Sequence, residues 1–395
     1  MKEDILDALV LMPQHRLKHK RSRSTTLDDL IDDQRSLGNL RSSSFDYVMM
    51  GYRFHHLFQR DLKAFLKKPL QPKLIEDLLQ IAFAAILSRK EEQESGLVFW
   101  TVEIAKEHFN PAIGPMVNAF CRHIQREKPK LLELSKSHPE LLLGKELSSR
   151  WKKFPNLIQR TSIRLSDRPE SGIEGFTSDF KWQRYETKVL KEQQFQAMNR
   201  ASWDFCQLSL KEIRKHLSGK KVSILDACAA PGAKLICLQQ GLKNSSEAID
   251  FWATEAKFSR MDRLKENLNR WELQNTVSTK LFSWGEGNTW ENGPHDLIFA
   301  DLPCTGSGTI IERPDLLIKD FKEELSHLSK IQTSILEQLM GQLKAGGVLF
   351  VSICSIDPEE IENISKFLGI PLTYDTRTQK ERTFEDLVGW FFKKN

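Results

Sequence analysis

Residues Ile224–Lys234 read Ile-Leu-Asp-Ala-Cys-Ala-Ala-Pro-Gly-Ala-Lys, an apolar, strand-like start that runs into a turn of small residues. Small side chains in such a turn let the backbone come close to a ligand, and a helix that begins near Lys234 would point its N-terminus at the turn. From about Lys220 onward, strand-like and helix-like segments alternate. This alternation predicts a parallel α/β sheet whose ligands bind at the carboxyl ends of the strands.

The alternation defines five strands and three helices. The predicted strands are Val222–Leu225, Phe251–Thr254, Val277–Phe282, Leu297–Ala300 and Val348–Ser352. The predicted helices are Leu235–Leu242, Ser259–Trp271 and Leu325–Leu343. Glu255 would end the second strand, where a carboxylate commonly holds ribose hydroxyls. The turn lacks the GxGxxG pattern of NAD sites, yet it does not by itself separate NAD from S-adenosylmethionine.

Two cysteines directly follow predicted strands. Cys304 lies in Asp301-Leu-Pro-Cys, and Cys354 lies in Val351-Ser-Ile-Cys-Ser. A thiolate that adds to carbon 6 of a pyrimidine makes carbon 5 nucleophilic, so that it can accept a methyl group. Asp301 is placed to act at the N3 edge of such a base. A buried cysteine more often serves as a small apolar residue, which is our interpretation of Cys121, Cys206 and Cys237.

Composition narrows the class of protein. The chain has 395 residues, 40% of them hydrophobic, and a net charge of only +5, which permits nucleic-acid binding without arguing for it. Its six cysteines form no CxxC pair, so we expect free thiols of a reducing compartment and no metal site. The N-terminus has no apolar signal-peptide core, and no apolar stretch is long enough to span a bilayer. We predict a cytoplasmic monomer that does not bind membranes.

The N-terminal part has a different pattern. Residues from about 40 to 127 show helical spacing of apolar residues, as in Leu74, Leu78, Ala82 and Ile86, and no catalytic constellation. We interpret this part as a docking module. We divide the chain into a helical domain (1–127), a linker with a small RNA-binding subdomain (128–200) and an α/β domain (201–395).

Arginine and aromatic residues interleave in the middle region. Cations beside aromatic rings suit single-stranded nucleic acid, although surface arginines over scattered core aromatics would look the same. The residues concerned are Arg160, Arg164, Arg168, Lys181 and Arg184 with Phe176, Phe180, Trp182 and Tyr185.

These motifs together resemble the Nol1/Nop2/Sun family of RNA 5-methylcytosine methyltransferases. The similar segments are Asp226–Lys234, Asp301–Gly308, Arg313–Asp315, Ile353–Ser355 and Pro358–Glu360 with Asn363. The stretch Leu78–Arg122 is similar to the NusB-like domain of the Sun (Fmu) branch, whose members methylate small-subunit (16S) ribosomal RNA. The resemblance implies a Rossmann-like, S-adenosylmethionine-dependent methyltransferase domain preceded by an all-helical NusB-like, RNA-binding domain.

The resemblance also implies roles for individual residues. By position, Cys354 is similar to the family's nucleophile and Cys304 to the residue that assists release of the product. Asp301 and Lys234 complete the implied catalytic set, with Lys234 reaching toward the base. The implied S-adenosylmethionine site consists of Asp226, Cys228, Ala229, Ala230, Pro231, Gly232, Ala233, Lys234, Glu255 and Asp301.

The chain departs from the family pattern at several positions. Ala233 replaces a usual glycine, so its backbone has to avoid positive φ. Ile353 replaces a usual threonine beside the nucleophile. Phe282-Ser283 stands where the family has an aspartate at the adenine.

Three functions therefore compete. Methylation of cytosine C5 in RNA through a cysteine adduct, with 16S ribosomal RNA as substrate, explains both cysteine motifs. A non-catalytic RNA-binding or ribosome-assembly factor that keeps the fold is the alternative that Phe282-Ser283 favours. A DNA cytosine methyltransferase would use the Pro-Cys thiol alone, so a second motif of the Cys354 type is not expected there.

Overall fold

The chain folds into two compact units. The computed structural model describes residues 1–21, 42–153, 157–158, 161, 173–177, 182–185, 195–217, 221–245, 248–371 and 387–394. The first unit contains Met1–Pro169 and Thr309–Glu324, and the second contains Glu170–Gly308 and Leu325–Asn395. The division made from the sequence, with boundaries near 127 and 200, does not anticipate that Thr309–Glu324 packs with the N-terminal helices.

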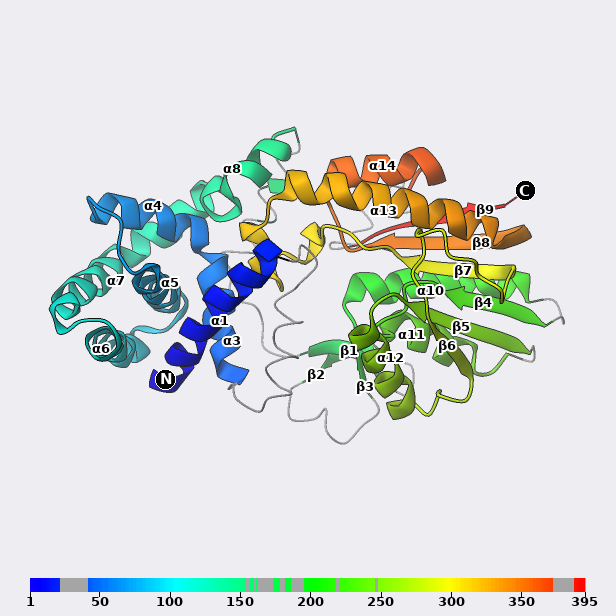
Figure 1. The fold of residues 1–395 in the computed structure, drawn as a ribbon, viewed down its shortest axis with the longest axis horizontal. Helices are drawn as coiled ribbons and strands as arrows, with labels where there is room; N and C mark the ends of the chain where they lie inside the picture. Colours follow the sequence, from blue (N-terminus) through cyan, green and yellow to red (C-terminus); the bar gives the residue numbers. More distant parts are fainter. Residues whose placement is uncertain are drawn as a thin grey trace. The chain divides into compact units, whose positions relative to one another are not determined.

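The first unit is helical (Figure 1). Its core is α5 (Lys73–Ser88), which packs against α1, α3, α6 and α7 and buries nearly its whole length from Ile75 to Leu87. Because α5 is covered by other helices on all sides, its own sequence is apolar around most of its circumference. The other helical elements are α1 (Lys2–Arg21), α3 (Ser42–Arg53), α4 (His55–Phe65), α6 (Glu91–His108), η1 (Pro111–Ile113), α7 (Gly114–Ser137) and α8 (Glu140–Arg150).

The segment Thr309–Glu324 joins this unit through its short helix η4 (Pro314–Ile318), which packs against α3. Arg53 donates a hydrogen bond to the carbonyl of Ile311 at 2.7 Å. The fully buried Asp315 pairs with Arg313 at 2.9 Å and lies 3.7 Å from His15. The buried polar groups of this segment are thus paired with each other or with side chains of the N-terminal helices.

The second unit is built on a six-stranded sheet with the order β6-β5-β4-β7-β8-β9. The first five strands in this order are parallel, and β9 pairs antiparallel with β8. The strands are β4 (Val222–Asp226), β5 (Ile249–Glu255), β6 (Val277–Leu281), β7 (His295–Asp301), β8 (Leu343–Ile353) and β9 (Val388–Lys393).

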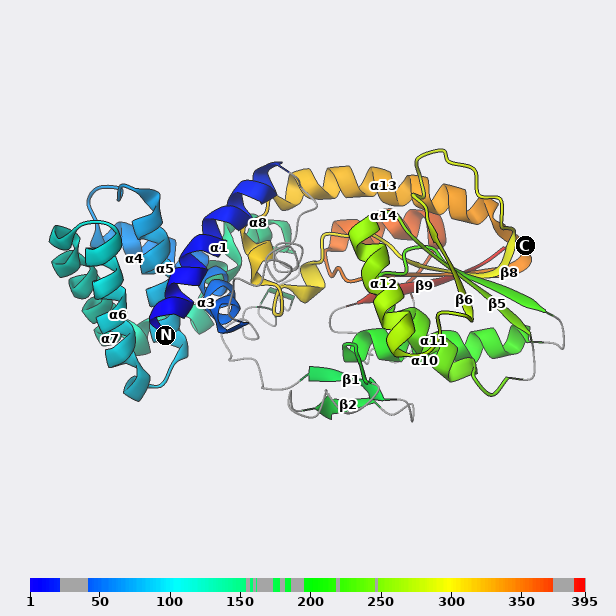
Figure 2. The same ribbon diagram turned by 60° about the horizontal axis from the view of Figure 1, so that its bottom comes forward.

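Helices cover both faces of this sheet (Figure 2). On one face, Ile224, Phe299 and Phe350 form a core with residues of α10 (Arg200–His216), α11 (Ala233–Leu242) and α12 (Phe258–Arg270). On the other face, their chain neighbours Leu225, Ile298 and Leu349 pack against α13 (Phe321–Gly341) and α14 (Pro358–Leu368). Both faces being covered explains why the strands are almost continuously apolar.

The structure confirms the five predicted strands and adds elements that were not predicted. The prediction ran the last helix to Leu343, but α13 ends at Gly341 because Leu343 already pairs with His295 as the start of β8. The antiparallel strand β9 and the small sheet of β1 (Ile173–Thr177), β2 (Trp182–Tyr185) and β3 (Phe195–Ala197) were also missed. After β7, the short helix η3 (Ser307–Thr309) leads into the segment that contains η4.

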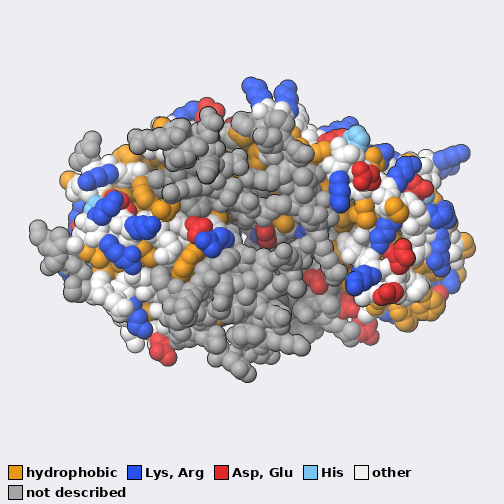
Figure 3. Space-filling view, turned by 180° about the vertical axis from the view of Figure 1, so that it is seen from behind, with side chains coloured by type: hydrophobic (Ala, Val, Ile, Leu, Met, Phe, Trp, Pro, Cys, Tyr) orange, Lys and Arg blue, Asp and Glu red, His pale blue; other side chains and the backbone are white. Residues whose placement is uncertain are grey.

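Most of the interleaved arginine, lysine and aromatic residues of the middle region belong to segments that the structure does not describe. Arg160, Arg164, Arg168, Phe180 and Lys181 lie outside the described residues. On the face drawn in Figure 3, the described Lys and Arg side chains are spread among Asp and Glu side chains. Within the described part of the chain, no helix combines the length and apolarity that crossing a membrane requires.

Candidate active site

The loop after β4 is anchored to both neighbouring strands. Asp226 ends β4, and the N–H of Ala227 donates to the carbonyl of Phe299 on β7 at 2.8 Å. The N–H of Ala229 donates to the carbonyl of Thr254 on β5 at 2.9 Å. These hydrogen bonds hold the small-residue turn at the carboxyl edge of the sheet, as the sequence predicts.

Gly232 is the residue of this turn that has to be glycine. Its φ is 102°, and a Cβ atom added there would lie 2.8 Å from Cδ1 of Leu264 on α12. Ala233 then begins α11, and Glu272 is the one non-glycine residue with positive φ in the described ranges. The expectation that Ala233 avoids positive φ is therefore confirmed.

The turn lines a solvent-open hollow of about 370 Å³. Eight of the residues predicted for the cofactor line it, together with Phe299, Ala300 and Ser352, which sequence reasoning missed. The eight are Asp226, Cys228, Ala229, Ala230, Pro231, Ala233, Lys234 and Asp301.

The two other predicted cofactor residues lie beside the hollow rather than in its lining. Gly232 shapes the turn, and Glu255 ends β5. The Glu255 carboxyl accepts the N–H groups of Ala256 and Lys257 at 3.0 and 3.2 Å, with Arg260 Nε 3.5 Å away. These contacts fix the direction of a carboxyl group at the end of β5.

Asp226 is almost fully buried at the base of the hollow. Burial, and next the negative charge of Asp301, raise the pKa of Asp226 to about 7. An acid of this kind changes its charge near neutral pH, so a ligand that supplies a hydrogen-bond donor or positive charge would favour its ionised form.

Asp301 is held from both sides. Lys234 Nζ lies 2.6 Å from Asp301 Oδ2, and Ser352 Oγ donates to Asp301 Oδ1 at 2.7 Å. Burial lowers the pKa of Lys234, but the charge of Asp301 and the hydrogen bond to it outweigh burial and raise that pKa to about 12. Lys234 is therefore a fixed positive charge in the site.

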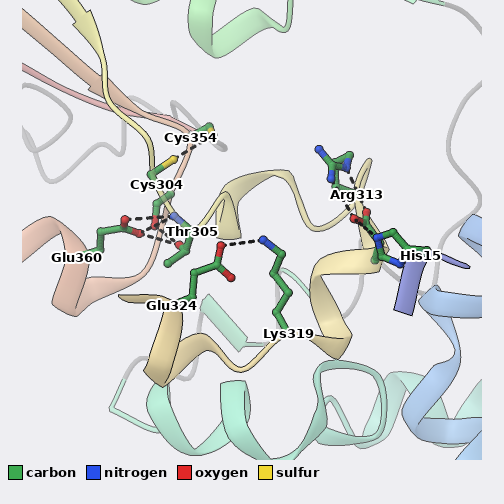
Figure 4. Close-up of polar contacts among 10 residues, drawn as sticks. His15, Cys304, Thr305, Arg313, Lys319, Glu324, Cys354 and Glu360 are labelled. Atoms are coloured by element: carbon green, nitrogen blue, oxygen red, sulfur yellow. Dashed lines mark hydrogen bonds and ion pairs between the residues drawn. The ribbon is translucent and has the colours of Figure 1, made fainter. Parts of the chain in front are cut away.

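The two strand-end cysteines face each other. Cys304 follows β7 and Cys354 follows β8, and because these strands are adjacent and parallel their ends meet. The two Sγ atoms are 3.2 Å apart (Figure 4). The sequence predicted both thiols at this edge of the sheet, and the structure brings them into hydrogen-bonding contact.

The environment distinguishes the two thiols. The hydrogen bond with Cys304 lowers the pKa of Cys354, and the charge of Lys234 acts in the same direction. The same hydrogen bond, together with burial, raises the pKa of Cys304 well above its ordinary value. These opposite shifts make Cys354 the more readily ionised thiol of the pair and hence the better nucleophile.

Three polar residues around the thiols were given no role from the sequence. Thr305, Gln332 and Glu360 form buried hydrogen bonds beside Cys304. Glu360 could have been found from the sequence, since Pro358–Glu360 belongs to a motif similar to the family's. Its distance along the chain from the two cysteines, however, indicated no role for it. Gln332 carries no such signal, because its position depends on how α13 packs.

Comparisons with known proteins find similar sequences. The family model described as 16S rRNA methyltransferase RsmB/F matches residues 217–383. The Bacillus subtilis protein named probable ribosomal RNA small subunit methyltransferase B is 27% identical over 344 residues, which is 77% of this chain and 74% of that protein.

Other relatives match a shorter region at higher identity. Ribosomal RNA small subunit methyltransferase B of Shewanella oneidensis is 33% identical over 42% of this chain, and that of Proteus mirabilis is 38% identical over 37%. These matches span only 38% and 34% of the relatives' own lengths.

A solved structure shares the fold over the whole chain. The crystal structure of PH0851 has a TM-score of 0.63 at 17% identity, covering 99% of this chain and 97% of that one. Residues 217–383 thus match the model of the 16S rRNA methyltransferase RsmB/F family, and most of the chain is similar to the Bacillus subtilis protein.

Proposed function

We propose that this protein is an S-adenosylmethionine-dependent RNA cytosine C5 methyltransferase that acts on small-subunit (16S) ribosomal RNA through a covalent cysteine adduct. The observation that carries the proposal is the pair of thiols 3.2 Å apart, next to the hollow at the carboxyl edge of the sheet. The family match and the names of the relatives support RNA as the substrate.

The residues of the hollow fit the cofactor. Ala229, Ala230 and Ala233 leave room for a ligand against the backbone, while Asp226 and Asp301 provide negative charge for a sulfonium and an amino group. Glu255, held at the end of β5, is the acceptor that we assign to ribose hydroxyls. When bound, S-adenosylmethionine supplies an electrophilic methyl group.

Cys354 is the nucleophile in this proposal. Its Sγ adds to carbon 6 of cytosine, and the electron pair of the C5–C6 double bond then makes carbon 5 able to accept the methyl group. After transfer, a base removes the carbon 5 proton, the double bond re-forms, and the C6–S bond breaks.

Cys304 assists this last step. Because its thiol hydrogen-bonds Cys354 Sγ, it can donate to that sulfur as the sulfur leaves carbon 6. Asp301, fixed by Lys234 and Ser352, is assigned to the N3 edge of the base, and Lys234 balances the charge of the site.

The helical region is proposed as the RNA-docking module. Residues 1–127 supply the NusB-like helices, residues 128–200 a linker with a small RNA-binding subdomain, and residues 201–395 the methyltransferase domain. We further propose that the protein works as a monomer in the cytoplasm.

A methylation assay tests the function. The full chain is incubated with labelled S-adenosylmethionine and unmodified 16S ribosomal RNA, and the product is mapped by mass spectrometry. We expect 5-methylcytosine in the RNA. Binding of S-adenosylhomocysteine and RNA without any methyl transfer would instead favour the non-catalytic RNA-binding or assembly factor.

A further inference from the structure

One buried pair of side chains holds the backbone on both sides of Cys304. Gln332 Nε2 on α13 donates to the carbonyl of Pro303, the residue before Cys304, at 2.8 Å. Glu360 Oε1 on α14 accepts the N–H of Thr305, the residue after Cys304, at 3.2 Å. Gln332 Nε2 also donates to Glu360 Oε1 at 2.8 Å, so the two side chains that contact the Cys304 backbone are hydrogen-bonded to each other.

The Glu360 carboxyl group is enclosed and faces donors on both oxygens. The residue is 0% exposed, and Thr305 Oγ1 donates to Oε2 at 2.7 Å (Figure 4). Glu360 lies in the first turn of α14, capped by Asp357, where the helix dipole favours negative charge. A carboxylate only accepts hydrogen bonds, and this one receives them from the backbone and side chain of Thr305 and from Gln332.

The same network reaches the other thiol. Thr305 Oγ1 lies 3.1 Å from Ser355 Oγ, and Ser355 follows Cys354 directly. The N–H of Gly308 donates to the carbonyl of Cys354 at 3.1 Å. A shift of Thr305 would therefore change the relative position of the two loops that carry the thiols.

We propose that Glu360 is the positioning residue for Cys304, whose backbone it holds with Gln332 so that Cys304 Sγ stays against Cys354 Sγ. This inference rests on the proposed function. It predicts that Glu360 matters most at release of the methylated RNA, because release is the step assigned to Cys304, and less at the attack of Cys354.

The charge of Glu360 acts on both thiols. The hydrogen bond with Cys354 and burial are the main causes of the raised pKa of Cys304, and the negative charge of Glu360 raises the pKa of Cys304 and of Cys354 alike. The proposed role of Glu360 therefore rests on its hydrogen bonds to Thr305 and Gln332.

The test uses Glu360→Gln in the full chain. The amide keeps the size of the side chain but turns one acceptor into a donor that faces Thr305 or Gln332. We expect multiple-turnover methylation to fall about tenfold or more, as misplaced catalytic groups commonly cause. Covalent protein–RNA complex should accumulate on denaturing gels, while S-adenosylhomocysteine affinity in calorimetry stays unchanged, because Glu360 does not line the cofactor hollow.

Matched variants separate positioning from general stability. Glu362→Gln changes an exposed residue of the same helix whose partner is Lys366 at 3.4 Å, and it should release RNA as the wild type does. Thr305→Val removes the hydroxyl that Glu360 accepts and should also accumulate the complex. Thr305→Ser keeps a hydroxyl and should restore release. If Glu360→Gln does not fold, the comparison of Thr305→Val with Thr305→Ser tests the positioning role instead.

Cys304→Ala, run in parallel, separates this inference from the proposed function. If Cys304→Ala forms no covalent complex, the proposed mechanism itself is wrong, and the inference with it. If Cys304→Ala traps RNA while Glu360→Gln and Thr305→Val release it at the wild-type rate, only the positioning role is refuted. Joint loss of complex and methylation with a lower melting temperature would likewise refute it, since that pattern marks a purely structural role.

Discussion

At the scale of single residues, the chemistry depends on how buried charges are placed around the thiols. The hydrogen bond between the thiols lowers the pKa of Cys354 and raises that of Cys304, and the charge of Lys234 further lowers the pKa of Cys354. The sequence predicted that Cys304 and Cys354 both follow strands at the carboxyl edge of the sheet. It could not predict the 3.2 Å contact or its asymmetry, because these depend on Lys234, Gln332 and Glu360 arriving from three different helices.

Asp226 makes the stability of the folded protein depend on pH. Its pKa is raised to about 7 from an ordinary value of 3.8, so the folded protein binds this proton more tightly than the unfolded chain does. Between about pH 4 and 7 the folded state therefore holds more protons here. This group then makes the ligand-free protein less stable as pH rises, by at most about 1.4 kcal/mol per pH unit.

Asp226→Asn should remove this contribution. Melting temperatures of the ligand-free full chain, measured from pH 5 to 8, should fall less steeply for Asp226→Asn than for the wild type. Glu266→Gln, an exposed change on α12, should keep the wild-type slope. Equal slopes for Asp226→Asn and the wild type would show that Asp226 does not carry a raised pKa.

At the scale of elements, the pattern of apolar residues predicted the five parallel strands, but it did not predict the antiparallel edge strand β9. Strands β4, β5, β7 and β8 are buried on both faces, so their apolar runs are unmistakable. Strand β9 pairs antiparallel with β8, and this pairing joins residues far apart in the chain, which no local pattern encodes. The end of α13 was placed two residues late, because Leu343 fits the helix period as well as the strand that it begins.

The turn between β4 and α11 gives a prediction for this scale. Gly232→Ala should cost about 1–2 kcal/mol for the left-handed backbone alone, and more because the new Cβ would meet Leu264 Cδ1. Calorimetry should also show weaker S-adenosylhomocysteine binding, since the turn lines the hollow.

The matched control for Gly232 is Gly287→Ala. Gly287 has a φ of 75°, but a Cβ there would meet nothing within 4 Å. It should therefore show the backbone cost without the loss of ligand binding. Wild-type ligand affinity in Gly232→Ala would contradict the role given to this turn.

At the scale of the whole molecule, the chain leaves the sheet-containing unit after Gly308 and returns at Leu325. In between, Arg313 pairs with Asp315, and Asp315 lies 3.7 Å from His15 of the N-terminal helix α1. The motif Arg313–Asp315 was recognised in the sequence, but not the unit that it belongs to. Its burial depends on His15 and Arg53, which are more than 250 residues away in the chain, and sequence patterns do not record such pairings.

The central claim is that Cys354 forms the covalent bond to RNA and Cys304 helps to break it. The measurement is a denaturing gel of the full-length protein after incubation with labelled, unmodified 16S ribosomal RNA and S-adenosylmethionine. Cys304→Ala should trap the RNA on the protein, whereas Cys354→Ala and the double variant should trap none and transfer no methyl group. Cys121→Ala, which alters a buried thiol of the helical unit, should behave as the wild type. Trapping by Cys354→Ala instead would reverse the two roles, and full methylation by both single variants without any trapping would contradict the covalent mechanism.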